Sequence, residues 1–267
     1  MSSKFTLGLC LALACVAIQA APLSFETKTI KAESCFLDKE KRCHENTVAY
    51  PITGDKHFDA WVKWLFNGKL PTQKSIKQEL LNSEMFKDVN ESNQEEDNDY
   101  PCALAFYNEL ELEGFSPNYA VFGLEQWEYT CGVHGRGTHD LAVLPRNQTN
   151  PRPVKLKDIV LPNQMDKLIH LQKEALIKYL QANDRINIEM SEKEAREYFH
   201  EYNKKFDGTD NWRIGKNSIV FLFQEYEVAA YAYRRPELAI PIKDLQGIIK
   251  PEILRETEQY TPRPEKP

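Results

Sequence analysis

Residues 102–144 read CALAFYNELELEGFSPNYAVFGLEQWEYTCGVHGRGTHDLAVL. Apolar and aromatic side chains gather here in four short runs, at 104–107, 119–122, 127–131 and 141–144. Glycines and a proline separate the runs: Gly114, Pro117, Gly123 and the glycines of 132–137. Short apolar runs divided by turn residues are typical of strands that pair antiparallel. The stretch therefore predicts an antiparallel sheet.

Helical spacing appears on both sides of this stretch. Apolar residues recur at three and four positions over 58–66, before Gly68 and Pro71, and over 165–180. Ser191 and Glu194 have the spacing of a capping box that would open a helix over 195–202. Further strands are predicted at 27–31, 47–50, 217–223, 228–233 and 238–242. Because strands and helices come in blocks, the predicted class is α+β, with antiparallel sheets and packed helices.

The first twenty residues have the features of a secretory signal peptide. Lys4 precedes an apolar stretch over 5–18, and Ala20 ends a short segment suited to cleavage. No later segment is long and apolar enough to span a membrane. We therefore expect a periplasmic or secreted protein. Cys15 lies in a weak lipobox, so an outer-membrane lipid anchor is the alternative.

The rest of the chain is expected to form two subdomains, over 21–150 and 151–250, with a flexible tail over 251–267. An acidic loop is predicted over 84–99, a segment that contains seven acidic residues and a single basic residue, Lys87. Such a segment is typical of a solvated loop, and the alternative is a surface that attracts a basic ligand.

Export changes the interpretation of the 6 cysteines. Signal cleavage removes Cys10 and Cys15, and four cysteines in an oxidising compartment indicate two disulfides. Zinc-type spacings are absent from the sequence, and no metal or cofactor is predicted. Among the three pairings, the one most local in sequence is favoured, which joins Cys35 to Cys43 and Cys102 to Cys131.

Charge and composition limit the classes of partner. Hydrophobic residues make up 42% and charged residues 28% of the chain, as in ordinary globular proteins. The net charge is −6, and it becomes −7 when Lys4 leaves with the signal. Nucleic acid is therefore disfavoured, since phosphate binding needs clustered positive charge. A basic protein partner fits this balance.

His134, His139 and Asp140 form the densest polar cluster in the chain. They would suit a metal-dependent envelope hydrolase, but the surrounding glycines favour a polar turn. No nucleophile-elbow motif G-x-S-x-G occurs in the sequence. The prediction is a protein that is not an enzyme, with the hydrolase as the alternative.

Several segments together carry a family resemblance. They read YTCGVHG at 129–135, VKLKDIV at 154–160, SIVFLFQEYEVAAYA at 218–232 and AIPIKDL at 239–245, and Tyr50-Pro51 matches an early element. The chain resembles the extracytoplasmic domain family shared by the anti-sigma factor RsiV and the peptidoglycan deacetylase PdaC. Cys131 and Val133 depart from the family's turn, where glycine and alanine are common.

The resemblance implies an α+β fold and an exported, non-catalytic binding module. The partner it implies is lysozyme, another basic protein or peptidoglycan. The residues expected to bind are Tyr129, His134, Arg136, Tyr226 and Tyr231. A structural protein of the envelope is a third interpretation of the same sequence.

Overall fold

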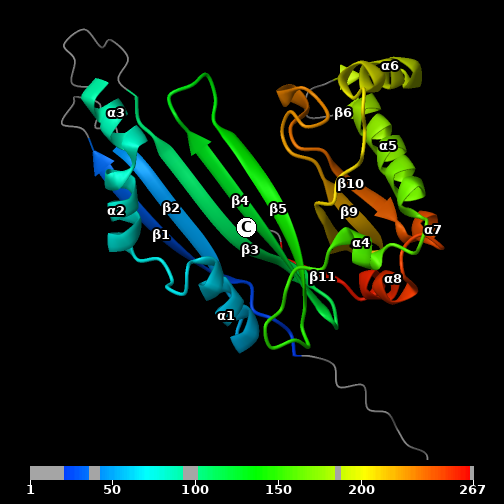
Figure 1. Ribbon diagram of the computed structural model, residues 1–267, viewed down its shortest axis with the longest axis horizontal. Coiled ribbons are helices and arrows are strands. Elements are labelled where there is room, and N and C mark those ends of the chain that lie inside the picture. The colour runs from blue at the N-terminus through cyan, green and yellow to red at the C-terminus, as the bar shows by residue number, and fades with distance from the viewer. Residues whose placement is uncertain (1–20, 36–42, 93–101, 184–187, 265–267) are drawn as a thin grey trace, which may run out of the picture.

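The computed structural model describes residues 21–35, 43–92, 102–183 and 188–264. The predicted signal peptide, with Cys15, lies outside the described residues. The main sheet is built from β1 (Glu26–Cys35), β2 (Cys43–Ile52), β3 (Ala105–Phe115), β4 (Tyr119–Tyr129) and β5 (Arg136–Pro145), in that order (Figure 1). β2 and β3 pair parallel, and the other neighbours pair antiparallel.

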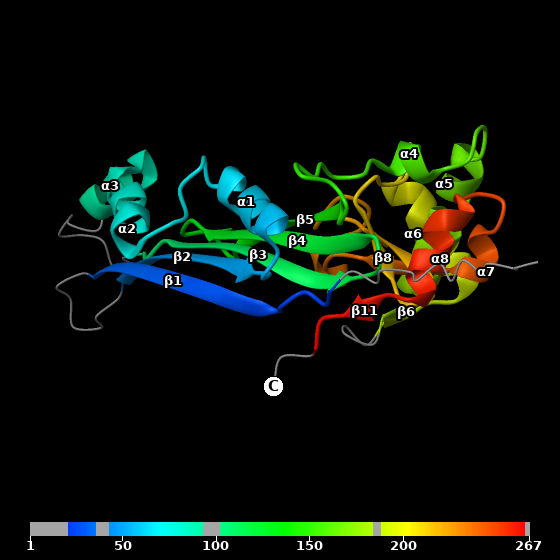
Figure 2. The same ribbon diagram turned by 90° about the horizontal axis from the view of Figure 1, so that it is seen from below.

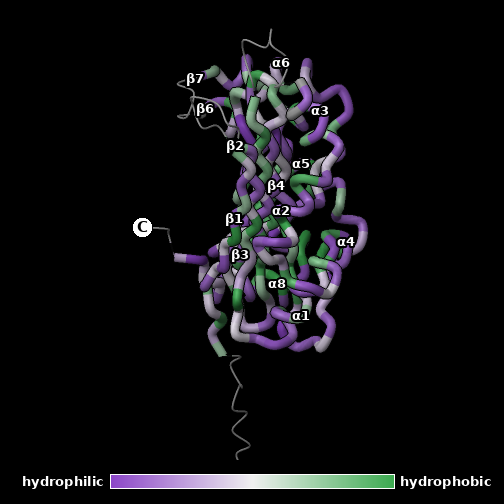
Figure 3. Tube along the Cα trace, turned by 90° about the vertical axis from the view of Figure 1, so that its left-hand side faces the viewer, coloured by the Kyte–Doolittle hydropathy of each residue, from purple (hydrophilic) through white to green (hydrophobic). Residues whose placement is uncertain are grey.

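Helices cover part of one face of this sheet, which we call the helix-bearing face. These are α1 (Lys56–Leu65), α2 (Gln73–Asn82) and α3 (Glu84–Ser92), and Figure 2 shows them on the same side of the strands. Phe58 and Trp61 of α1 pack on Phe122 of β4, with ring centroids 5.6 and 5.0 Å apart. Hydrophobic and hydrophilic residues alternate along the strands (Figure 3), as expected for a sheet with faces of different character.

The C-terminal half packs a smaller sheet against helices. Its long helix α5 (Met165–Gln181) lies beside α6 (Glu192–Tyr202), and a three-stranded antiparallel sheet joins β8 (Trp212–Gly215), β9 (Ser218–Leu222) and β10 (Glu237–Pro241). Short elements complete it: α4 (Leu156–Ile159), β6 (Ala182–Asn183), β7 (Ile188–Glu189), the 3-10 helix η1 (Tyr231–Tyr233) and α7 (Ile242–Leu245). Val121 and Val143 of the main sheet belong to the same buried cluster, so this cluster joins the two halves.

The free edge of β5 is closed by two side-chain amides from the C-terminal half. Gln224 Oε1 accepts from the His139 N–H at 2.9 Å, and Asn211 Oδ1 accepts from the Leu141 N–H at 2.8 Å. Both amide nitrogens donate to the His139 carbonyl, at 2.8 and 2.9 Å. An edge strand otherwise presents unpaired backbone groups. These four bonds fix the C-terminal half against β5.

The α+β class is confirmed, and so is the disulfide pairing Cys35–Cys43 and Cys102–Cys131. The long helix at 165–180, the helix at 58–66 and the capping box of Ser191 and Glu194 are confirmed as well. Within the described residues, no helix is long and apolar enough to cross a membrane.

The predicted break at Gly123 is wrong, because β4 runs unbroken through that position. A Cβ at Gly123 would overlap the side chains of Glu113 and His139. These two side chains form a hydrogen-bonded pair, with His139 Nε2 3.0 Å from Glu113 Oε1. The glycine therefore provides room for the pair rather than a turn.

Three other expectations are corrected. Residues 84–92 of the predicted acidic loop form α3, where Phe86 packs on the His44 ring at 4.8 Å, while 93–99 lie outside the described residues. The strand expected over 228–233 is wrong, since residues 228–230 form no regular element and 231–233 form η1. The predicted flexible tail holds α8 (Pro251–Glu258) and β11 (Thr261–Pro262), which pairs with β3, because Ile253 and Tyr260 are buried.

His44 is expected to make folding sensitive to acid. Its side chain is 1% exposed, and Nδ1 accepts from the Leu104 N–H at 3.0 Å, which requires an unprotonated nitrogen. Burial holds the pKa of His44 below its ordinary value. The unfolded chain therefore binds more protons, so this stability is present above the ordinary histidine pKa and is lost as pH falls through it.

We expect His44→Gln to flatten the fall in Tm between about pH 7 and pH 5, because glutamine can still accept the Leu104 bond without titrating there. Thermal unfolding followed by circular dichroism over this range measures the effect. His200→Gln, which removes an exposed histidine, is the matched control and should retain the wild-type slope. An unchanged slope in His44→Gln would contradict the prediction.

Candidate functional site

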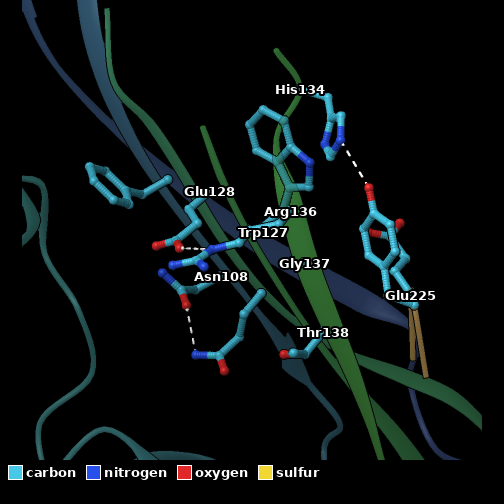
Figure 4. A pocket seen from close by; sticks show the side chains of 11 residues that line it. Asn108, Trp127, Glu128, His134, Arg136, Gly137, Thr138 and Glu225 are labelled. Carbon is cyan, nitrogen blue, oxygen red and sulfur yellow. Dashed lines mark hydrogen bonds and ion pairs between the residues drawn. The ribbon is translucent and has the colours of Figure 1, made fainter. Parts of the chain in front are cut away.

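A cavity of about 630 Å³ opens over β3, β4 and β5 (Figure 4), and we call it the trough. Its floor consists of side chains that the strand register places in two rows. Asn108, Gln126 and Thr138 are cross-strand partners in one row. Phe106, Glu128 and Arg136 form the next row. Both rows lie on the helix-bearing face, because Gln126 and Glu128 are an even number of residues from Phe122 along β4.

Contacts within each row orient the polar groups of the floor. Gln126 Nε2 donates to Asn108 Oδ1 at 3.1 Å, and Arg136 Nε lies 2.6 Å from Glu128 Oε1 (Figure 4). An exposed ion pair of this kind contributes only about 0–1 kcal/mol to stability. Its effect is to balance the charge of the floor, which then presents amide, hydroxyl and guanidinium groups.

One wall of the trough is aromatic. His134 stacks on Tyr231 with ring centroids 4.2 Å apart, and Tyr226 stacks on Tyr231 at 5.4 Å. His134 Nδ1 lies 2.8 Å from the Gly135 carbonyl, which can only accept, so Nδ1 carries the proton. His134 Nε2 then accepts from the Tyr226 hydroxyl at 3.1 Å (Figure 4). We call these three rings the aromatic shelf.

The backbone that holds the shelf is strained at two places. Tyr226 has a φ of +64° and Cys131 a φ of +68°, in the left-handed region. Each such residue costs about 1–2 kcal/mol. Residues in this region gather at ligand sites when the surrounding structure fixes them. Here the Cys102–Cys131 disulfide and the Gln224 bonds to β5 hold the neighbouring chain.

The glycines of the turn serve packing. Trp127 lies across Gly135, and a Cβ at that position would overlap the indole ring. At Gly137 a Cβ would lie 2.7 Å from the Gln126 carbonyl oxygen. The run Gly135-Arg136-Gly137 therefore lets Trp127 fold over the start of β5.

The structure brings together three of the five residues predicted to bind. His134, Arg136 and Tyr226 line the trough, and Tyr231 contacts it through the stack with His134. Tyr129 is not part of the lining. It stacks on Trp127, with centroids 6.5 Å apart, and points away from the face that carries Glu128.

The candidate hydrolase residues do not converge. His139 and Asp140 are neighbours in β5 and therefore point to opposite faces. His139 Nε2 pairs with Glu113, and His134 is bonded to Tyr226. Among the described residues, Glu33, Cys35 and Cys43 have ligand atoms close enough for a metal, but the two sulfurs form a disulfide.

Sequence reasoning missed most of the floor. The lining residues that were missed are Phe106, Asn108, Gln126, Trp127, Glu128, Gly137, Thr138 and Glu225. Phe106 and Glu128 lie within predicted strands, but Asn108, Gln126 and Thr138 lie outside them. Without the register, nothing shows that Asn108, Gln126 and Thr138 stand side by side.

Comparisons with known proteins agree with this fold. Residues 157–243 match a family model described as "Protein of unknown function (DUF3298)". A DUF3298 family structure from Bacteroides fragilis superposes with a TM-score of 0.68 at 19% identity, covering 88% of this chain and 97% of that one. A DUF3298 family protein from Pseudomonas aeruginosa has a TM-score of 0.57 at 18% identity, covering 86% and 96%. Curated protein sequences give no match.

Gly135→Ala should loosen the trough. The added Cβ must displace Trp127, and overpacking of this kind costs about 1–3 kcal/mol. Denaturant unfolding measures the loss, and tryptophan fluorescence should shift to longer wavelength as the indole becomes exposed. Gly132→Ala is the matched control, because its nearest neighbour would lie 3.6 Å away. Equal stability of the two variants would show that the contact with Trp127 is unimportant.

Proposed function

We propose that this chain is an exported, non-catalytic binding module of the RsiV/PdaC-like type, and that the trough binds cell-wall glycan. The observation that carries the proposal is the trough itself, with its hydrogen-bonding floor beside an exposed aromatic shelf. Tyr226 is 50% exposed there, although it is a large aromatic residue.

The chemistry of the trough suits a sugar chain. A sugar ring carries hydroxyl and N-acetyl groups at its edge and C–H groups on its faces. Asn108, Gln126 and Thr138 offer donors and acceptors to the edge, and Tyr226 offers a ring to the face. The volume of about 630 Å³ lies within the range of about 300–1,000 Å³ that is usual for small-ligand sites.

Two further features support an exported protein without catalysis. The disulfides Cys35–Cys43 and Cys102–Cys131 suit an oxidising compartment, periplasmic or secreted, with lipid anchoring at Cys15 as the alternative. His139 and Asp140 are consecutive in β5, so their side chains point to opposite faces of the sheet. This arrangement argues against the hydrolase alternative.

Lysozyme or another basic protein is the second candidate partner. The net charge of −6 favours it, and Glu225 adds an acidic group at the trough. Opposite charge speeds association more than it fixes the final affinity. A basic protein would therefore bind with a marked dependence on salt.

Titration of the mature protein with a soluble N-acetylglucosamine disaccharide, followed by calorimetry, tests the glycan proposal. We expect Tyr226→Ala to weaken binding at least about tenfold, or about 1.4 kcal/mol, because the ring is truncated. Tyr226→Phe, which keeps the ring and loses the hydroxyl, should stay close to wild type. Absence of disaccharide binding would overturn the proposal, and lysis of purified walls would overturn the non-catalytic part.

Calorimetric titration of the mature protein with lysozyme tests the second candidate partner. Micromolar binding that weakens as salt rises from about 0.05 to 0.5 M would support it, because screening shortens the reach of surface charges. Failure to bind at micromolar concentration in low salt would exclude lysozyme as the partner.

A further inference from the structure

A second cavity of about 990 Å³ lies further along β5. It is lined by Trp61 and Trp64 of α1, by Asp140 of β5 and by the segment from Asn150 to Leu156. The cavity is therefore bounded by both halves of the chain.

The two cavities share one strand as their floor. Thr138 lines the trough and Asp140 lines the second cavity, and the two residues are two positions apart in β5. Side chains at this spacing point to the same face, about 7 Å apart. The two cavities therefore have lining residues next to one another along the same face of β5.

Trp64 is the most exposed large ring of the second cavity. It is 69% exposed, whereas its neighbour Trp61 is buried against Phe122 at 5.0 Å. Tryptophan is highly buried on average, so an exposed indole beside a cavity is an informative feature. It gives the second cavity an aromatic surface comparable to the shelf of the trough.

The charges of the second cavity balance. Asp140 and Asp210 stand with Arg152 and Lys155 in its lining. The floor of the trough is balanced in the same way by Glu128 and Arg136. Glu225 leaves the trough with one further acidic group, while the charges of the second cavity cancel. Because both cavities also offer amide groups and an exposed ring, they suit a largely uncharged polar chain better than an ion.

We propose that the trough and the second cavity are two subsites of one groove, which binds an extended N-acetylated polysaccharide strand along β5, with Trp64 as its distal stacking platform. This inference rests on the proposed glycan binding in the trough. It adds that the ligand is a polymer and that residues from α1 contribute to recognising it.

Chain length provides the test. Two subsites occupied by one molecule gain from effective concentration, which raises affinity by up to about 10²–10⁴. We therefore expect an N-acetylglucosamine hexasaccharide to bind at least about tenfold more tightly than the disaccharide. In Trp64→Ala this gain should disappear while disaccharide affinity is unchanged, whereas Tyr226→Ala should weaken both ligands.

Leu70→Ala is the matched control, since it truncates an exposed apolar side chain outside both cavities. It should leave both affinities unchanged. Disaccharide binding without a gain for the hexasaccharide, or a gain that survives in Trp64→Ala, would overturn the extended groove and leave the proposed function intact. Failure of the wild type to bind either oligosaccharide would overturn both.

Discussion

The structure depends on how the free edge of β5, the last strand of the main sheet, is closed. The side-chain amides of Asn211 and Gln224 take the place of a further strand beside β5, and they satisfy both backbone groups of His139. Gln224 lies two residues before Tyr226. The bonds that close the sheet edge therefore also bring Tyr226 to within 3.1 Å of His134. Closure of the edge and positioning of the aromatic shelf therefore depend on the same segment of chain.

Features fixed by local chemistry could be predicted from the sequence. The capping box at Ser191, the amphipathic spacing of 165–180 and the nearest-neighbour disulfides each depend on residues close in the chain. His134 and Tyr226 could be predicted because they lie in segments that carry the family resemblance, and Arg136 directly follows one of these segments. The floor could not be predicted, because Asn108, Gln126 and Thr138 become neighbours only when three strands pair.

The errors have physical causes of the same kind. Residues 84–92 are so rich in charge that they resemble a loop, yet Phe86 can pack on the buried His44 ring, and this contact favours the helix. The tail carries few apolar residues, but Ile253 and Tyr260 enter a core that the sequence does not reveal. Gly123 lies within β4, although glycine usually interrupts strands, because the side chains of Glu113 and His139 occupy the space that a Cβ would need. Tertiary contacts override local preference in all three cases.

At position 226 the fold and the proposed glycan binding favour different residues. The left-handed backbone there would be relaxed by glycine or asparagine, so the tyrosine is the less stable choice for the fold. Proteins commonly accept such a loss where activity requires it, and stabilising changes at these sites tend to reduce function. Selection for thermal stability alone would therefore favour replacement of Tyr226. The resulting protein would be more stable, but its aromatic shelf would lack the exposed ring.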